Sequence, residues 1–143
     1  MTTYEDDVAA WAIEQVALLR AGHFDQIDVE HIAEEIEDMN LSNRHQLAHR
    51  MSVLLAHLLK WQRQPERRGS SWERTIRTQR DRIARLLRRM PSLRHLLADD
   101  EWSEDVWDDA VSIAEIETNL HDLPQTRPWT YEQFLAPDFF PDS

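Results

Sequence analysis

The sequence predicts an all-α protein: a single-domain helical bundle of about five helices over residues 1–143, closed by an extended aromatic- and proline-rich C-terminal strap. The chain has 143 residues, a length that suits one domain. It has two glycines, whereas an average usage of ~7% would give about ten, which disfavours β-barrels and glycine-rich phosphate loops. All its glycines and prolines lie between stretches of helical periodicity, as expected of residues that separate helices.

The first two predicted helices cover residues 4–21 and 28–39. Gly22 is suited to the left-handed position that ends a helix, and Asp28 is suited to cap the next one. Asn40 and Ser42 are expected to break the second helix. Both helices carry an apolar stripe at helical spacing, formed by Val8, Trp11, Ala12, Gln15, Leu18 and Leu19 in the first and by Val29, Ile32, Ile36 and Met39 in the second.

Two longer helices are predicted over residues 43–63 and 70–90. The first has a wide stripe of leucines that ends at Trp61, which indicates the centre of the fold. For the second, Ser70 and Glu73 have the spacing of a capping box. Trp61 and Trp72 lie on the apolar stripes of these neighbouring helices, so both are predicted to be core residues.

A single turn over 92–97 and a fifth helix over 99–120 complete the bundle. The acidic residues in the first turns of the fifth helix complement the helix dipole. The tail that follows is rich in proline and aromatic residues, and we expect it to lie across the bundle. Thr130 and Gln133 have capping-box spacing for one short turn within it.

Charge is divided into three blocks. Residues 1–43 carry eleven acids and one base, residues 44–94 carry three acids and fourteen bases, and residues 95–143 carry thirteen acids and one base, which together give the net charge of −11. The basic block is nearly all arginine, whose planar fork pairs with carboxylates or phosphates. The favoured interpretation is that the acidic blocks of this chain, or of a second copy, satisfy the arginines.

The candidate contact residues are Arg67, Arg68, Arg74 and Arg77, at the start of the fourth predicted helix. They fit an acidic protein partner or, as an alternative, nucleic acid. Because the net negative charge opposes the approach of a polyanion, we favour the protein partner.

The acidic stretch EHIAEEIEDM offers an enzyme alternative. His31, Glu35 and Asp38 are spaced to lie along one helix face, and with His57 they are the candidate ligands of a divalent ion in a metal-dependent hydrolase. A solvated acidic helix shows the same pattern, so no metal, cofactor or catalytic residue is expected. The absence of cysteine excludes thiolate chemistry and every Cys-containing zinc site.

Polar residues on the apolar stripes predict a polar layer in the core. Gln79 and Arg80 lie on or beside the stripe of the fourth predicted helix. Buried polar groups need partners, so Arg80 is expected to pair with a carboxylate such as Glu35.

Four stretches carry a resemblance to a known family: LLRAGHFDQIDVEHIAEEIEDM (18–39), LLAHLLKWQRQPERRGSSWERTIRTQR (54–80), RIARLLRRMPSL (82–93) and RPWTYEQFLAPDFFPDS (127–143). Together they resemble domain-of-unknown-function family 29. The resemblance implies a small, stand-alone, all-helical bacterial protein, and it supplies no catalytic residue, cofactor or substrate.

The combined prediction is a non-catalytic interaction module that self-associates or docks a protein partner through its arginine-rich middle segment. The acidic start of the chain differs from a signal peptide, and the longest uncharged apolar stretch, residues 51–59, is half the length of a membrane span. We therefore expect a soluble, cytoplasmic protein with no membrane partner.

Overall fold

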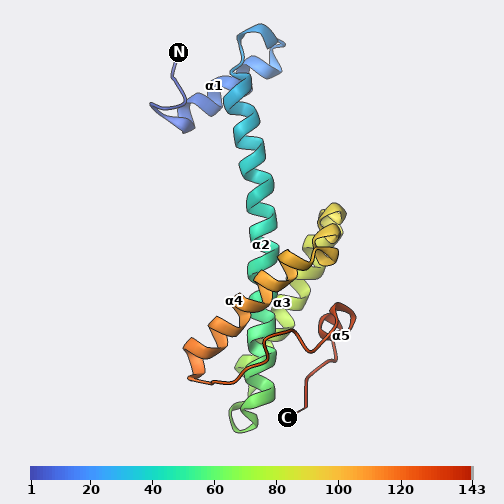
Figure 1. The fold of residues 1–143 in the computed structure, drawn as a ribbon. Helices are drawn as coiled ribbons and strands as arrows, with labels where there is room; N and C mark the ends of the chain where they lie inside the picture. Colours follow the sequence, from blue (N-terminus) through green and yellow to red (C-terminus); the bar gives the residue numbers. More distant parts are fainter. Residues whose placement is uncertain (143) are drawn as a thin grey trace. The chain divides into compact units, whose positions relative to one another are not determined.

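The computed structural model describes residues 1–142 and confirms the all-α prediction, since no strand occurs in that range. The α-helices and the 3₁₀ segments that join them follow one another along the chain as shown in Figure 1: α1 (Val8–Arg20), η1 (Phe24–Gln26), α2 (Val29–Arg63), η2 (Pro65–Arg67), α3 (Ser70–Arg89), η3 (Pro91–Ala98), α4 (Asp100–Thr118) and α5 (Tyr131–Leu135).

The chain groups into two compact units. The N-terminal unit is Met1–Asn43 and the C-terminal unit is Arg44–Ser143. Helix α2 contributes residues to both units. The two units are described separately below.

The C-terminal end of α1 follows the predicted signal, but the helix begins at Val8, four residues later than the predicted start at residue 4. Asp7 caps the helix, because its side chain accepts a hydrogen bond from the Ala10 N–H at 3.1 Å. After the C-cap, Gly22 has a φ of +78°, a backbone conformation that glycine adopts without steric cost. The predicted end of the first helix is therefore confirmed.

The predicted break at Asn40 and Ser42 is wrong, because α2 runs from Val29 to Arg63 without interruption. Both residues are exposed, and in an exposed helix interior each costs less than about 0.7 kcal/mol relative to alanine. The strong helix formers on either side outweigh that cost. The predicted cap is present: the Asp28 side chain accepts a hydrogen bond from the His31 N–H at 3.3 Å.

The predicted capping box of α3 is also wrong. The helix begins one residue earlier than a Ser70 cap requires, with Gly69 as N-cap and no side-chain hydrogen bond. The Gly69 carbonyl instead accepts the first helical hydrogen bond from the Glu73 N–H at 3.1 Å. A capping box does form at α5, where Thr130 and Gln133 bond to each other's backbone N–H as predicted.

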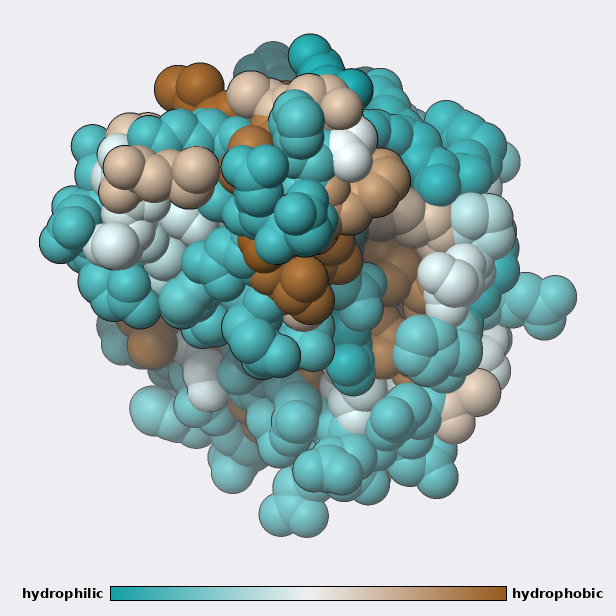
Figure 2. All heavy atoms as spheres, turned by 90° about the horizontal axis from the view of Figure 1, so that it is seen from above, coloured by the Kyte–Doolittle hydropathy of each residue, from teal (hydrophilic) through white to brown (hydrophobic). Residues whose placement is uncertain are grey.

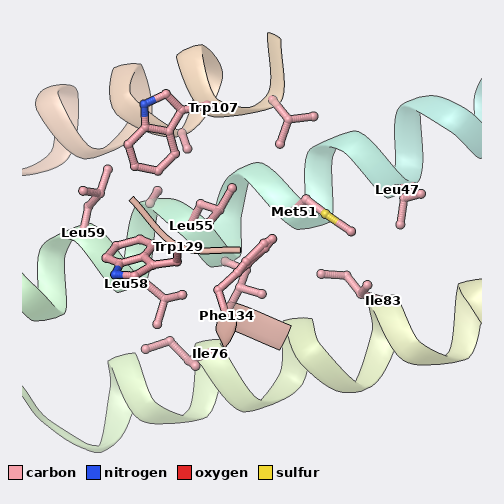
Figure 3. Close-up of a cluster of buried hydrophobic side chains, with 14 of the residues drawn as sticks. Leu47, Met51, Leu55, Leu58, Leu59, Ile76, Ile83, Trp107, Trp129 and Phe134 are labelled. Carbon is pink, nitrogen blue, oxygen red and sulfur yellow. The ribbon is translucent and has the colours of Figure 1, made fainter. Parts of the chain in front are cut away.

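The hydrophobic core belongs to the C-terminal unit. Figure 3 shows side chains from α2, α3, α4 and the tail meeting in one cluster. Its fully enclosed members include Leu55 from α2, Ile76 from α3 and Phe134 from α5. The predicted wide stripe on the C-terminal part of α2 is thus the centre of this core.

Trp61 and Trp72 are not core residues as predicted, since both are only half-buried. Trp61 packs on the edge of the cluster, and its ring centroid lies 4.8 Å from that of Phe140 in the tail. Trp72 lies over the Lys60 ammonium group at 5.2 Å from the ring centroid. Indole rings serve well at such boundaries, because one edge stays apolar while the other remains accessible to solvent.

The tail crosses the core as the predicted aromatic strap. Trp129 and Phe134 are buried in the cluster shown in Figure 3. The Trp107 indole N–H of α4 donates to the Pro124 carbonyl at 3.0 Å, which fixes the path of the chain where the strap begins. Aromatic burial and backbone hydrogen bonds together hold this segment in place.

Candidate functional site

The arginines of residues 44–94 are the most prominent chemical feature of the C-terminal unit. Lys60 is ion-paired with Glu117, with 2.5 Å between Nζ and Oε2. Arg68 aside, no arginine within residues 1–142 has a carboxylate oxygen within 4.0 Å. Arg68 aside, Lys60–Glu117 is thus the one direct ion pair between the basic block and an acidic flank among residues 1–142, and the expected neutralisation of the arginines by the same chain is not formed in this way.

The four predicted contact residues differ in their surroundings. Arg67, Arg74 and Arg77 are exposed on η2 and α3. Arg68 is partly buried: its Nε donates to the Trp61 carbonyl at 2.7 Å, and its guanidinium lies 5.3 Å from the Trp61 ring centroid. Arg68 thus contributes to the structure of the α2–α3 connection, whereas the other three offer charge to solvent.

The predicted pairing of Arg80 with Glu35 is wrong. Arg80 is buried, but its guanidinium donates to backbone carbonyls of the tail, at 3.0 Å to Phe134, 3.2 Å to Pro137 and 2.5 Å to Phe139. Burial lowers the pKa of this guanidinium from its usual value. The Arg80 side chain therefore holds the C-terminal strap on α3 by binding the backbone of the strap.

Gln79 also belongs to the polar layer, but it faces another arginine. Its Oε1 accepts a hydrogen bond from Arg50 Nη1 of α2 at 3.3 Å. The polar residues of α3 thus have separate partners: Arg80 holds the tail and Gln79 holds a neighbouring helix. The pattern in the sequence placed both residues on or beside the apolar stripe; the partner predicted for Arg80 was wrong, and none was predicted for Gln79.

Three of the four candidate metal ligands have other partners, and the remaining one, Asp38, is exposed. Glu35 accepts a hydrogen bond from the Tyr4 hydroxyl at 2.5 Å, and this bond raises the pKa of Tyr4 to about 12. In the described part of the chain, no three His, Asp or Glu side chains are grouped as an ion would require.

His31, the third candidate, is held by an aspartate. Its Nδ1 lies 2.7 Å from Asp28 Oδ2, and its ring stacks on Tyr4 with 4.2 Å between centroids. The hydrogen bond to Asp28 raises the pKa of His31 and lowers the pKa of Asp28. Asp28 also accepts a hydrogen bond from the Trp11 indole N–H at 3.0 Å. This arrangement stabilises the turn between α1 and α2.

His57, the fourth candidate, lies beside a cation. Its Nδ1 is 2.9 Å from the Val53 carbonyl, so Nδ1 carries the proton and Nε2 is the acceptor. Nε2 is 3.5 Å from the Lys60 ammonium. Burial, aided by the positive charge of Lys60, lowers the pKa of His57. The lone pair that could bind a metal therefore points at an ammonium group.

Lys60 is a buried charge whose partner, Glu117, the sequence did not predict. It is the only lysine of the chain and is 5% exposed. Glu117, His57 and the Trp72 ring surround its ammonium group. A lone lysine within an apolar helix stripe was the available signal, because a buried ammonium requires a counter-ion.

The N-terminal unit exposes most of its apolar side chains, contrary to the predicted buried stripes. Trp11 and Gln15 are its only buried residues. Figure 2 shows brown, hydrophobic side chains at the surface between hydrophilic ones. Of the eleven exposed large hydrophobic residues, ten lie in this unit: Met1, Val8, Ile13, Val16, Leu19, Phe24, Val29, Ile36, Met39 and Leu41.

The regular structure of residues 1–142 consists of helices alone. None of these helices is long and apolar enough to cross a membrane. A family model described as "Domain of unknown function DUF29" matches residues 3–140, so the chain belongs to this family. The chain matches no curated protein and no solved structure.

Proposed function

We propose that the protein is a non-catalytic interaction module that self-associates. In this proposal the acidic, apolar surface of the N-terminal unit of one copy contacts Arg67, Arg74 and Arg77 of a second copy. The proposed setting is the cytoplasm of a bacterium, as expected from the family resemblance and the acidic composition.

The exposed apolar side chains of the N-terminal unit carry this proposal. Ile13 is 73% exposed and Phe24 is 65% exposed. Exposed apolar side chains gathered on one unit favour an interaction site, because burying apolar surface gains about 25 cal/mol per Å². The N-terminal unit has 43 residues, of which two are buried and ten are exposed large hydrophobic residues. Its own fold therefore leaves most of its apolar side chains in contact with solvent.

Charge selects the surface that receives the N-terminal unit. Residues 1–43 carry eleven acids and one base, so two N-terminal units placed face to face would repel each other. Arg67, Arg74 and Arg77 are exposed without a carboxylate within 4.0 Å. Pairing the acidic unit with these arginines satisfies both charges and leaves the apolar side chains to provide the affinity.

Sedimentation equilibrium of the full chain tests this proposal. We expect a dimer or higher oligomer whose dissociation constant rises with salt, because exposed ion pairs are screened. Replacing Ile13, Ile36 and Met39 together by serine removes apolar surface of the N-terminal unit and should weaken association at least about tenfold, or ~1.4 kcal/mol. Ile116→Ser is the matched control, since Ile116 is 80% exposed in the C-terminal unit.

The arginine side of the contact is tested separately. Arg74→Glu with Arg77→Glu should weaken association, and the exposed Arg88→Glu should leave it unchanged. A wild-type chain that stays monomeric at the highest concentrations reached contradicts the proposal. Duplex DNA should bind no better than the non-specific range of ~10⁻⁴–10⁻⁶ M at physiological salt; tighter binding with a steep salt dependence would favour nucleic acid as the partner.

A further inference from the structure

A second cluster of arginines lines a small cleft between α2 and α3, away from the predicted contact residues. The cleft has a volume of about 140 Å³ and is lined by Gln46, Arg50, Arg82, Arg85, Leu86 and Arg89. Four of these six residues are arginines, and no carboxylate is among them. Figure 1 shows α2 and α3 running beside each other in the C-terminal unit.

Helical spacing explains why these side chains converge. Gln46 and Arg50 are four residues apart on α2, and Arg82, Arg85 and Arg89 are three and four residues apart on α3. Residues at these spacings lie on one face of a helix. Each helix therefore presents a row of side chains to the cleft, and the two rows face each other across it.

Arg50 is held in place within the cleft. It is partly buried, and its Nη1 donates to Gln79 Oε1 at 3.3 Å. Burial and the positive charge of Arg82 lower the pKa of Arg50 from its usual value. Arginine nonetheless stays protonated in proteins. Among residues 1–142, the Gln79 amide is the only side-chain hydrogen-bond partner of these two neighbouring cationic groups.

The charge of the cleft is uncompensated within the described chain. None of its four arginines has a carboxylate oxygen within 4.0 Å. Like charges gathered on one surface repel each other and focus a positive potential in the concave space between them. An anion in the cleft would relieve this repulsion and accept hydrogen bonds from several guanidinium groups at once.

We propose that the cleft between α2 and α3 is a binding site for a phosphate group, either inorganic phosphate or the terminal phosphate of a phosphomonoester. A phosphate dianion offers more acceptor oxygens and more charge than one carboxylate, and arginine forks bind phosphate in bidentate geometry. The small volume fits the head group and leaves any attached molecule outside. This site is independent of the proposed self-association, which uses Arg67, Arg74 and Arg77.

Isothermal titration calorimetry of the full chain with inorganic phosphate, in a phosphate-free buffer, tests the site. We expect saturable binding at one site per chain. Arg82→Gln and Arg85→Gln should each weaken binding about tenfold, which corresponds to ~1.4 kcal/mol. The matched control is Arg88→Gln, which removes the same charge from an exposed position of α3 outside the cleft and should retain wild-type affinity.

Further titrations distinguish the source of the phosphate. Tighter binding of a simple phosphomonoester than of inorganic phosphate identifies the end group of a larger molecule, and equal or weaker binding identifies the free ion; both outcomes support the site. An oligonucleotide that carries only phosphodiesters should bind more weakly than either ligand. Stronger binding of that oligonucleotide, sensitive to Arg82→Gln, overturns the proposal in favour of a nucleic-acid contact.

Three other results overturn the proposal. The first is the absence of phosphate binding. The second is a loss of affinity with Arg88→Gln equal to that with Arg82→Gln, which would show a diffuse charge effect. The third is dissociation of the oligomer by Arg82→Gln and Arg85→Gln without any effect on phosphate binding, which would make the cleft a protein contact. Sedimentation of the same variants separates these cases, and circular dichroism confirms that each variant is folded.

Discussion

Nε2 of His57 lies 3.5 Å from Nζ of Lys60, the only lysine of the chain. The neutral imidazole accepts from the ammonium through Nε2 and donates through Nδ1 to the Val53 carbonyl at 2.9 Å. Protonation of Nε2 would place two positive charges side by side within a partly buried site. The stability of the C-terminal unit is therefore coupled to the protonation of this histidine.

His57 should make the C-terminal unit less stable as the pH falls. Its pKa in the folded state lies below the ordinary value of 6.5, so its contribution is fully present above 6.5 and is lost as the pH falls through the folded-state pKa. Urea unfolding at several pH values should show this loss in the wild type and a smaller one in His57→Gln. The exposed His121→Gln serves as control, and an unchanged pH dependence in His57→Gln would contradict the assignment.

His31 should show the opposite pH dependence in the N-terminal unit. Its pKa is raised by Asp28, so its contribution is fully present below 6.5 and is lost as the pH rises through the folded-state pKa. Asp28 has a lowered pKa, so its contribution is lost only when the pH falls below the ordinary value of 3.8. An NMR titration should give His31 a pKa above 6.5, and Asp28→Asn should bring it down. An unchanged His31 titration in Asp28→Asn would refute the pairing.

Arg80 should be required for the attachment of the C-terminal strap. Arg80→Ala removes hydrogen bonds to three carbonyls, of which the contact to Phe134 is buried and those to Pro137 and Phe139 are partly buried, so we expect a loss of about 1–3 kcal/mol from the Phe134 carbonyl and a smaller loss from the other two. The exposed Arg77→Ala should change the free energy of unfolding by less than about 0.5 kcal/mol. Denaturant titration measures both variants, and equal stability would show that the carbonyl contacts contribute nothing.

Phe134 should contribute more to stability than either half-buried tryptophan. Its side chain is fully buried in the core, so Phe134→Ala should cost about 3–5 kcal/mol. Trp61→Ala and Trp72→Ala should cost clearly less, because each ring already contacts solvent along one edge. Thermal unfolding of the three variants checks the order; a larger loss in Trp61→Ala would restore it to the core.

Most of the helical architecture could be predicted because its signals are local. Gly22, Asp28 and the Thr130–Gln133 pair have the predicted roles at helix ends. Each role depends only on backbone groups a few residues away, so the local sequence is enough to predict it. The continuity of α2 could not be predicted in this way. The low helix propensities of Asn40 and Ser42 cost less free energy than the rest of the helix gains. These two residues alone therefore do not show whether the helix ends there.

The candidate site was only partly predictable. The arginine-rich segment is visible in the sequence, and its exposed members include Arg74 and Arg77. The sequence could not show that Arg50 meets Arg82, because they are thirty-two positions apart and no pairing signal links two like charges. The partners of Arg80 were missed for another reason: they are carbonyls, which every residue carries.

The hydrogen bonds from Arg80 to the tail affect which substitutions this part of the chain can tolerate during evolution. The three acceptors, at Phe134, Pro137 and Phe139, are main-chain oxygens. The hydrogen bonds of Arg80 therefore depend directly on the backbone path of the tail and not on the identity of its side chains. Substitution of the exposed Pro137 can leave those hydrogen bonds intact if the backbone keeps its path, whereas the Phe139 ring also packs against Trp129, with 6.0 Å between ring centroids. Mutational tolerance at this junction should therefore be asymmetric, with Arg80 and the buried Phe134 less tolerant of substitution than the exposed Pro137.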